Sequence, residues 1–290
     1  MLDGSVLVVE IAGQRLTRIF ADGRKKTVAV TGGGPNGAAI GPDGRCYLCN
    51  NGGMKWHEKG GRLLPGVVSE PHPGGWIEAV DLATGAVEIL YRGCNGQHLN
   101  APNDIVFDAH GGFWFTDHGK SYRRSRDRGA IYYAKADGSF IREVVFPSDS
   151  PNGIGLSPDG QRLYVAETHT ARIWSYAISA PGEIAPHRGV APWEKGRLVI
   201  GLGGYALLDS LAVEECGNIC VANIPEQGIT VVSPDGRVIE NIAMPDEVTT
   251  NICFGGPDMQ TAFITLSSTG QLVSVRWPRP GLRLNNAKPE

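Results

Sequence analysis

Residues with oxygen-bearing side chains stand at the start of five similar segments of the chain. In each segment the polar residue is followed by an apolar run, a turn and a second apolar run, and the five residues are Asn36, Asn103, Asn152, Asp209 and Asn251. Amide and carboxylate oxygens gathered in one place suit a hard cation, which takes oxygen ligands. Singly, Asn and Asp also cap turns by bonding their own backbone. Their matched positions favour a metal site over a set of independent caps.

The segments behind these residues repeat a two-strand pattern. Turn residues that tolerate positive φ, such as Asp43-Gly44 and Asp159-Gly160, separate runs rich in β-branched and aromatic residues, which predicts β-hairpins. A shorter sixth copy covers residues 3–10, and more amphipathic hairpins are predicted at 15–30, 76–91, 130–146 and 228–243. Two hairpins make a four-stranded unit, and six units predict an all-β fold, a six-bladed β-propeller. A β-sandwich would not repeat its polar ends six times, and a solenoid would need a shorter period.

In a propeller, both ends of each inner hairpin converge on one face. The five starting residues should therefore ring the axis. The residues that end the second strands should lie a little farther out, and these are Glu10, Asn51, Asp117, Glu167 and Asn223. We expect residues 1–290 to form one propeller domain, with a first blade that lacks its inner strand and a C-terminal tail at 278–290.

Composition and charge narrow the class of protein. Gly and Pro together make 59 of 290 residues (40 and 19), which favours many turns over long helices. The formal net charge is −3, from 27 basic and 30 acidic residues, and apart from a short basic run at 123–128 the charges are interspersed, so we expect no nucleic-acid partner. No apolar stretch approaches the roughly 20 residues that span a bilayer, and no secretory signal is visible, so we expect no membrane partner and a cytoplasmic location.

Several motifs resemble one family along nearly the whole chain. Pro102-Asn103-Asp104 with the following run to Asp117, Pro151-Asn152-Gly153, Leu208-Asp209-Ser210 and the segment 251–256 are similar to motifs of the SMP-30/gluconolactonase/luciferin-regenerating-enzyme-like family. Each motif alone is weak, but four in order at blade spacing are specific. The resemblance implies one divalent cation near the axis, held by Glu, Asn, Asn and Asp. Asn103, Asn152 and Asp209 match the last three ligands. The family's Glu would lie before Met1, and Glu10 is not its equivalent because it ends a second strand.

The resemblance also implies the chemistry, which is metal-dependent opening of a small lactone by an activated water. Asp209 is the expected general base, because it is the only carboxylate among the matched positions. Calcium is the expected metal for oxygen ligands, with zinc, magnesium or manganese as alternatives. The sequence contains no Gly-x-Ser-x-Gly elbow, so it gives no indication of a serine hydrolase. Two other interpretations remain open: hydrolysis of another ester class, such as a phosphotriester, on the same site, and a propeller that binds a ligand without catalysis.

Loops at the same face supply the residues expected to contact the lactone. They are Asn51, His98, Asn100, Asp117, His118 and Tyr205. The interval from Asn51 to Trp76 is the longest insertion and is rich in Gly and Pro, so it is either a lid over the site or a long loop.

Overall fold

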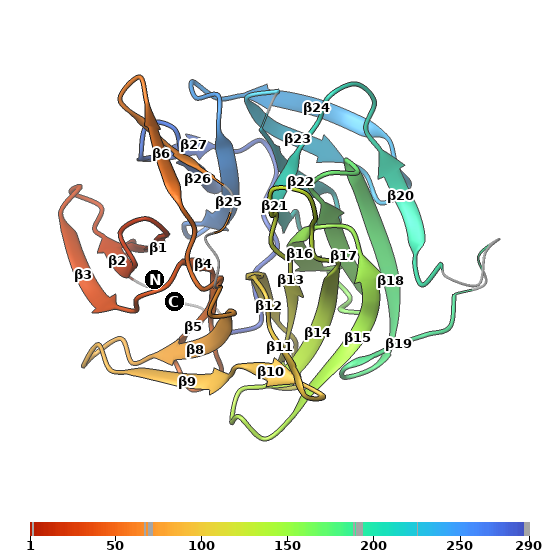
Figure 1. Ribbon diagram of the computed structural model, residues 1–290. Helices are drawn as coiled ribbons and strands as arrows, with labels where there is room; N and C mark the ends of the chain where they lie inside the picture. Colours follow the sequence, from red (N-terminus) through yellow and green to blue (C-terminus); the bar gives the residue numbers. More distant parts are fainter. Residues whose placement is uncertain are drawn as a thin grey trace. The chain divides into compact units, whose positions relative to one another are not determined.

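The computed structural model is built of β-strands, and it describes residues 1, 3–66, 68, 72–187, 189, 194–224 and 226–286. Six sheets of three to five antiparallel strands follow one another along the chain, together with two separate two-stranded ribbons (Figure 1). Within the described ranges there is no helix, and hence none that could cross a membrane. This is the strand arrangement of a six-bladed β-propeller, and the predicted fold class is confirmed.

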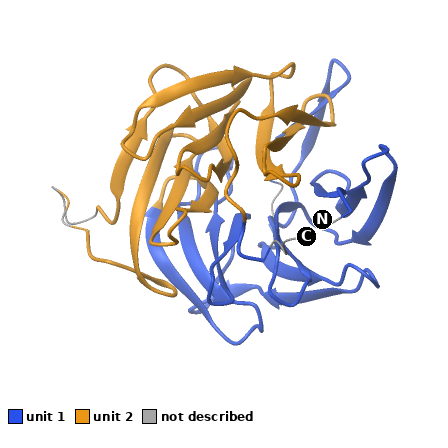
Figure 2. Ribbon diagram, turned by 180° about the vertical axis from the view of Figure 1, so that it is seen from behind, with its two compact units in different colours: residues 1–147, 284–290 blue, residues 148–283 orange. Residues whose placement is uncertain are grey.

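The chain divides into two compact units, which Figure 2 colours separately. Unit 1 comprises residues 1–147 and 284–290, and unit 2 comprises residues 148–283. In unit 1 the sheets are β1 (Val6–Glu10), β2 (Arg15–Ile19) and β3 (Lys25–Val30); β4 (Pro35–Ile40), β5 (Cys46–Asn50), β8 (Trp76–Val80) and β9 (Val87–Tyr91); and β12 (Pro102–Phe107), β13 (Gly112–Asp117), β14 (Gly129–Lys135) and β15 (Ile141–Ser148). The ribbons are β6 (Trp56–Lys59) with β7 (Arg62–Pro65), and β10 (Gly93–Cys94) with β11 (Gln97–His98).

Unit 2 contains the remaining three sheets. They are β16 (Pro151–Leu156), β17 (Arg162–Glu167), β18 (Arg172–Ala180), β19 (Glu183–Ile184) and β20 (Arg197–Gly201); β21 (Leu208–Val213), β22 (Ile219–Asn223), β23 (Gly228–Val232) and β24 (Val238–Ala243); and β25 (Thr249–Gly255), β26 (Thr261–Leu266) and β27 (Gln271–Arg276). The four predicted outer hairpins are β2–β3, β8–β9, β14–β15 and β23–β24. The insertion after Asn51 contains the ribbon β6–β7 rather than unbroken loop, and residues 67 and 69–71 of it lie outside the described residues.

Burial explains why the inner hairpins read as nearly continuous apolar runs. Every residue of β12 and β13 is buried, whereas β15 and β24 have exposed residues among buried or half-buried ones. In unit 1, Phe113 and Phe115 pack against Tyr47 and Phe107 of neighbouring strands in one core cluster. Strands buried on both faces carry apolar side chains at successive positions. The core therefore holds β12 and β13 in place from both sides.

The first sheet begins with the equivalent of a second strand. Glu10 at the end of β1 pairs with Arg15, in the same register as Asp117 of β13 with Ala130. β1 is thus equivalent to a second strand such as β13, and its sheet is β1-β2-β3. The single-domain organisation remains a prediction.

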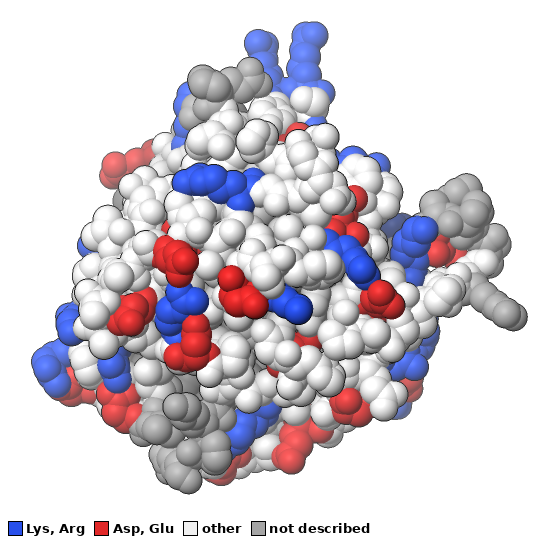
Figure 3. All heavy atoms as spheres, turned by 90° about the horizontal axis from the view of Figure 1, so that it is seen from below, with Lys and Arg blue, Asp and Glu red and all other residues white. Residues whose placement is uncertain are grey.

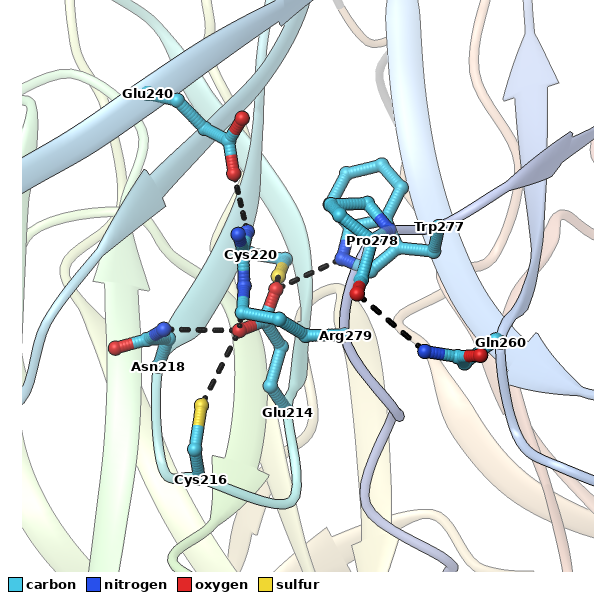
Figure 4. A network of polar contacts seen from close by, with 9 residues as sticks. All are labelled: Glu214, Cys216, Asn218, Cys220, Glu240, Gln260, Trp277, Pro278 and Arg279. Carbon is cyan, nitrogen blue, oxygen red and sulfur yellow. Dashed lines mark hydrogen bonds and ion pairs between the residues drawn. The ribbon is translucent and has the colours of Figure 1, made fainter.

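A buried carboxylate anchors the segment after β27 in unit 2 (Figure 4). Glu214, whose side chain is fully buried, accepts hydrogen bonds from Trp277 Nε1 at 2.7 Å and from Arg279 Nε at 2.6 Å. Arg279 also pairs with Glu240 of β24. Burial alone would raise the pKa of Glu214, but these donors outweigh it and the pKa lies below its ordinary value. The network fixes residues 277–279 against the β21–β22 turn.

On the face drawn in Figure 3, Lys and Arg side chains are interspersed with Asp and Glu, and neither sign forms a continuous patch. The expectation of no nucleic-acid partner stays a prediction.

Candidate functional site

The residues predicted as metal ligands share one local structure, a β-bulge at the start of the first strand. Pro102 pairs with Asp117 and Ile105 with Phe115, so Asn103 and Asp104 together face one residue of β13. The same irregularity follows Pro151 in β16 and Leu208 in β21, where it takes in Asn152 and Asp209. A bulge re-aims the side chains it carries, and bulges are frequent beside active sites. Asn103, Asn152 and Asp209 are therefore structurally equivalent, as their sequence positions predicted.

The strand register corrects two of the sequence-based equivalences. In β4 the bulge follows Pro35, which pairs with Asn50, so Asn50 and not Asn51 is the counterpart of Asp117. In β25 the bulge lies between Thr249 and Asn251, so Thr250 and not Asn251 occupies the position of Asp209. Each error is a shift of one residue, because the motifs were aligned by residue type, whereas pairing with the neighbouring strand decides the register.

Glycines let neighbouring first strands approach closely at the bulges. In unit 1, a Cβ placed on Gly37 would lie 2.4 Å from the carbonyl oxygen of Asn103. In unit 2, a Cβ placed on Gly153 would lie 2.5 Å from the nitrogen of Leu211 and 2.7 Å from the carbonyl oxygen of Asp209. Only a residue without a Cβ fits such contacts with backbone. The packing of β16 on β21 therefore brings the bulge of Asn152 against the bulge of Asp209.

Unit 2 supplies two of the three predicted ligands. Asn152 is buried and donates a hydrogen bond from Nδ2 to Thr168 Oγ1 at 3.0 Å, while Asp209 is half-buried. Beside them, Asn223 pairs with Leu208, and its buried Oδ1 has no hydrogen-bond partner among the described residues. A buried acceptor without a donor is a place for a cation or a bound water. Tyr205, predicted to contact substrate, is 74% exposed in the loop before β21.

The residues that end the second strands fix the chain where it enters the first strand. Asp117 accepts hydrogen bonds from the backbone amides of Asn100 and Ala101, both at 2.7 Å, and of Gly119 at 3.1 Å. Burial raises the pKa of Asp117, although these donors oppose the shift. In the next sheet, Glu167 similarly accepts from Ser148 Oγ and from the amide of Asp149. The contacts of Asp117 are those of a residue that positions Asn103 through the backbone before it. The sequence had predicted Asp117 only as a substrate contact.

A pocket of about 850 Å³ in unit 1 holds two of the predicted substrate contacts. It is lined by His98 and Asn100 together with residues 72–74, Tyr122, Ser125 and Asp127. His72 Nε2 lies 2.7 Å from the carbonyl oxygen of Asn100, and burial lowers the pKa of this imidazole. Asn103 follows Asn100 by three residues, so the pocket and the bulge belong to one stretch of chain. His118 is half-buried, with Nδ1 3.1 Å from the carbonyl oxygen of Gly119.

Lys120 is a feature of this region that sequence reasoning missed. The residue is only 7% exposed, and its Nζ donates to the carbonyl oxygen of Gly53 at 2.8 Å and to Asn51 Oδ1 at 3.4 Å. Burial lowers the pKa of this ammonium to about 8, against the opposing effect of Asp117 and Asp127. Asn51 is thereby engaged by Lys120 and by the amide of Gly53. The sequence signal was a lysine three residues after Asp117, the polar end of a buried strand.

The donor set fits a hard cation better than a soft one. Among the described residues, no group of three or more His, Cys, Asp or Glu side chains could hold a metal ion. The predicted ligands are instead two amides and one carboxylate, which offer oxygen atoms from three equivalent bulges. Oxygen ligands of this kind suit calcium or magnesium.

Comparison with solved structures identifies the fold that this chain shares with other proteins. A gluconolactonase structure from Xanthomonas campestris superposes with a TM-score of 0.73 at 23% identity, covering 96% of this chain and 83% of the other. Regucalcin from Agrobacterium tumefaciens, described as a calcium-binding protein, superposes with a TM-score of 0.71 at 20% identity, covering 98% of this chain and 91% of the other. At these identities the likeness shows the fold alone.

Sequence comparison adds the family. A model of the SMP-30/Gluconolactonase/LRE-like region matches residues 1–268, and the chain belongs to this family. It is 28% identical over 244 residues to a gluconolactonase of Zymomonas mobilis, covering 81% of this chain and 61% of that protein. It is 32% identical over 206 residues to diisopropyl-fluorophosphatase of Loligo vulgaris, covering 67% of this chain and 63% of that protein. The chain thus spans about three-fifths of the length of these two relatives.

Proposed function

We propose that this chain is a metal-dependent hydrolase that opens a small lactone, such as a sugar lactone, with an activated water. The observation that carries the proposal is the repeated bulge, which sets Asn103, Asn152 and Asp209 at the same position of three sheets. The family and the gluconolactonase relative support a lactone as the substrate.

In this proposal Asn103, Asn152 and Asp209 hold one divalent cation, as the family resemblance implies. Calcium is the favoured ion, because the donors are oxygens and because the regucalcin neighbour is described as calcium-binding. When bound, a divalent cation would supply Lewis-acid activation of the lactone carbonyl and of water.

Protein groups carry the other roles. Asp209, the one carboxylate of the set, accepts the proton of the attacking water, and a carboxylate near a cation stays ionised at neutral pH. Asp117 keeps the 100–101 backbone in place and so positions Asn103. His98 and Asn100, which line the pocket in unit 1, contact the ring of the lactone in this scheme.

A second candidate function is hydrolysis of a phosphotriester on the same residues. The 32% identity to diisopropyl-fluorophosphatase favours keeping it. The same Lewis-acid and base roles suit a phosphoryl centre, so the choice of substrate depends on the loops around the ligands.

The experiment starts from protein stripped with a chelator and then dialysed. Metal content is measured before and after reloading with Ca²⁺, Zn²⁺, Mg²⁺ or Mn²⁺, and hydrolysis of D-glucono-1,5-lactone and of diisopropyl fluorophosphate is followed in a pH-stat. We expect one metal per chain and lactone hydrolysis that depends on it. Stoichiometric metal without turnover of either substrate supports a ligand-binding propeller instead, and turnover unaffected by stripping contradicts the metal-dependent scheme.

A further inference from the structure

The segment 120–128 of unit 1, called here the basic loop, carries a concentration of positive charge that the proposed reaction does not use. It contains Lys120, Arg123, Arg124, Arg126 and Arg128, against a single acidic residue, Asp127. The loop is a short hairpin, because Ser121 forms a bridge with Arg126 and the amide of Asp127 donates to the carbonyl oxygen of Lys120 at 2.9 Å. Arg123 and Arg124 lie at its tip and are exposed.

The basic loop forms one wall of the pocket. Tyr122, Ser125 and Asp127 line it together with His98 and Asn100. Asp127 is already engaged, since its Oδ2 accepts from the amide of Lys120 at 3.1 Å and from Tyr122 Oη at 3.2 Å. A pocket of about 850 Å³ is of the size that takes a small molecule.

Lys120 stands at the base of the loop with a buried charge that forms no ion pair with a described residue, although the carboxylates of Asp117 and Asp127 lie near enough to stabilise it. Both acceptors of its ammonium, Gly53 O and Asn51 Oδ1, are neutral, and the described residues place no carboxylate in an ion pair with it. A neutral donor such as Gln could satisfy the same two acceptors without the cost of burying a charge. The ammonium is thus buried without a paired carboxylate among the described residues, and a negatively charged ligand would stabilise it further.

The acceptors of Lys120 connect it to the pocket. They flank Gly52, and a Cβ placed on Gly52 would lie 2.1 Å from the carbonyl oxygen of Gly74 and 2.8 Å from the ring of His72. His72 and Gly74 both line the pocket. The segment that holds the ammonium, residues 51–53, therefore packs against the pocket wall formed by residues 72–74, while Arg123 and Arg124 lie at the tip of the loop that forms another wall.

We propose that Lys120 and the arginines of the basic loop select a substrate that carries an acidic group in addition to the ester to be hydrolysed. This inference rests on the proposed lactone hydrolysis for its substrate class. The acidic group is a carboxylate or a phosphate, since a lysine and arginines bind both. The arginines attract the anion to the pocket, and Lys120 provides the buried counter-charge.

The test compares three lactones that differ in charge: neutral D-glucono-1,5-lactone, D-glucaro-1,4-lactone with a carboxylate, and 6-phospho-D-glucono-1,5-lactone with a phosphate. We expect the wild type to have a higher kcat/KM for at least one acidic lactone than for the neutral one. In Lys120→Met and in the double variant Arg123→Met/Arg124→Met, the ratio of acidic to neutral kcat/KM should fall, by about 10-fold or more for Lys120→Met. The matched control is Lys59→Met, which removes an exposed charge from β6 and should keep the wild-type ratio.

A binding measurement separates this inference from the proposed function. Calorimetry with D-glucarate, with inorganic phosphate and with uncharged D-glucitol needs no turnover, and any contribution of a bound metal is common to wild type and Lys120→Met. We expect the wild type to bind one of the anions about 10-fold more tightly than Lys120→Met does, with Lys120→Arg restoring part of the difference. Equal anion affinities in wild type and Lys120→Met overturn the inference even if lactones are hydrolysed. Anion binding that depends on Lys120 supports it even if no lactone is hydrolysed. If Lys120→Met does not fold, the arginine double variant decides: an unchanged substrate ratio and anion affinity overturn the inference, and a fall in both supports it.

Discussion

Asp117 accepts a 2.7 Å hydrogen bond from the backbone amide of Ala101, two residues before Asn103. The carboxylate that ends β13 thus holds the chain that leads into the bulge of β12. The same carboxylate also accepts hydrogen bonds from the backbone amides of Asn100 and Gly119. An ionised carboxylate has only acceptors, which matches these three backbone donors.

Replacing Asp117 with Asn should lower stability and disturb Asn103. An amide offers one oxygen and turns its NH₂ group toward donors, so we expect a loss of about 1.5–3 kcal/mol in the free energy of unfolding. Urea denaturation at pH 7 measures this, and metal affinity should weaken in the same variant. Asp137→Asn, in an exposed turn with Ser139, is the control and should have a much smaller effect. A wild-type denaturation midpoint in Asp117→Asn contradicts the positioning role.

Gly153→Ala should separate β16 from β21. The new methyl group would stand within 3 Å of the backbone at Leu211 and Asp209, and backbone cannot rotate away as a side chain can. Overpacking of this kind costs about 1–3 kcal/mol. Thermal denaturation and metal titration are the measurements. Gly203→Ala, where nothing lies within 4 Å of the added methyl group, is the control in the same unit. Equal losses in the two variants would leave no special role for the close approach.

Asp209→Asn tests the proton acceptor of the proposed reaction. The amide keeps an oxygen for a cation but cannot take a proton from water, so the rate at saturating metal should fall about 10²–10⁴-fold. Asn103→Ala should instead show its main defect in metal or substrate binding. Lactone hydrolysis is measured against pH and metal concentration for both. Wild-type turnover by Asp209→Asn at saturating metal would falsify the base role.

The stability of the protein should depend on pH through Lys120. Its pKa in the folded chain is lowered to about 8 from an ordinary value of 10.5, so between these values the unfolded chain binds more protons. The charged ammonium therefore opposes folding most below pH 8. This unfavourable contribution to the free energy of folding diminishes as the pH rises from about 8 to 10.5. Asp117, Asp127 and His72 are the ionisable groups that interact with this ammonium.

The measurement is the difference in free energy of unfolding, wild type minus Lys120→Met, at pH 7, 8, 9 and 10. Subtracting the variant removes the titration of other lysines and tyrosines. We expect this difference to become more positive as the pH rises, and a flat difference contradicts a lowered pKa.

Glu214→Gln should destabilise unit 2 strongly. The change leaves Arg279 without its buried partner, and breaking a buried ion pair costs about 3–5 kcal/mol. Because the pKa of Glu214 is lowered in the folded chain, the stabilisation is complete above pH 4.5 and is lost as the pH falls through the folded pKa. Chemical denaturation at pH 7 and at pH 4 measures both effects. Glu240→Gln, which removes only the partly exposed partner of Arg279, should cost less.

The sequence by itself predicts the six-sheet propeller, because the signals for its hairpins are local. A turn such as Asp159-Gly160 between two apolar runs specifies a hairpin without reference to distant residues, and repetition of the pattern indicates the blades. The same repetition correctly predicts that Asn103, Asn152 and Asp209 occupy equivalent positions.

Tertiary structure decided the register and the burial of charge. Asn50 rather than Asn51, and Thr250 rather than Asn251, hold the equivalent positions because pairing between strands sets the register, and residue type does not. Asp117 proves to be a backbone anchor only when the donors from 100–101 are seen. In the sequence, nothing distinguishes Lys120 from an ordinary loop lysine. It becomes a buried charge because residues 51–53, almost 70 positions earlier in the chain, fold over it and replace water with two neutral oxygens.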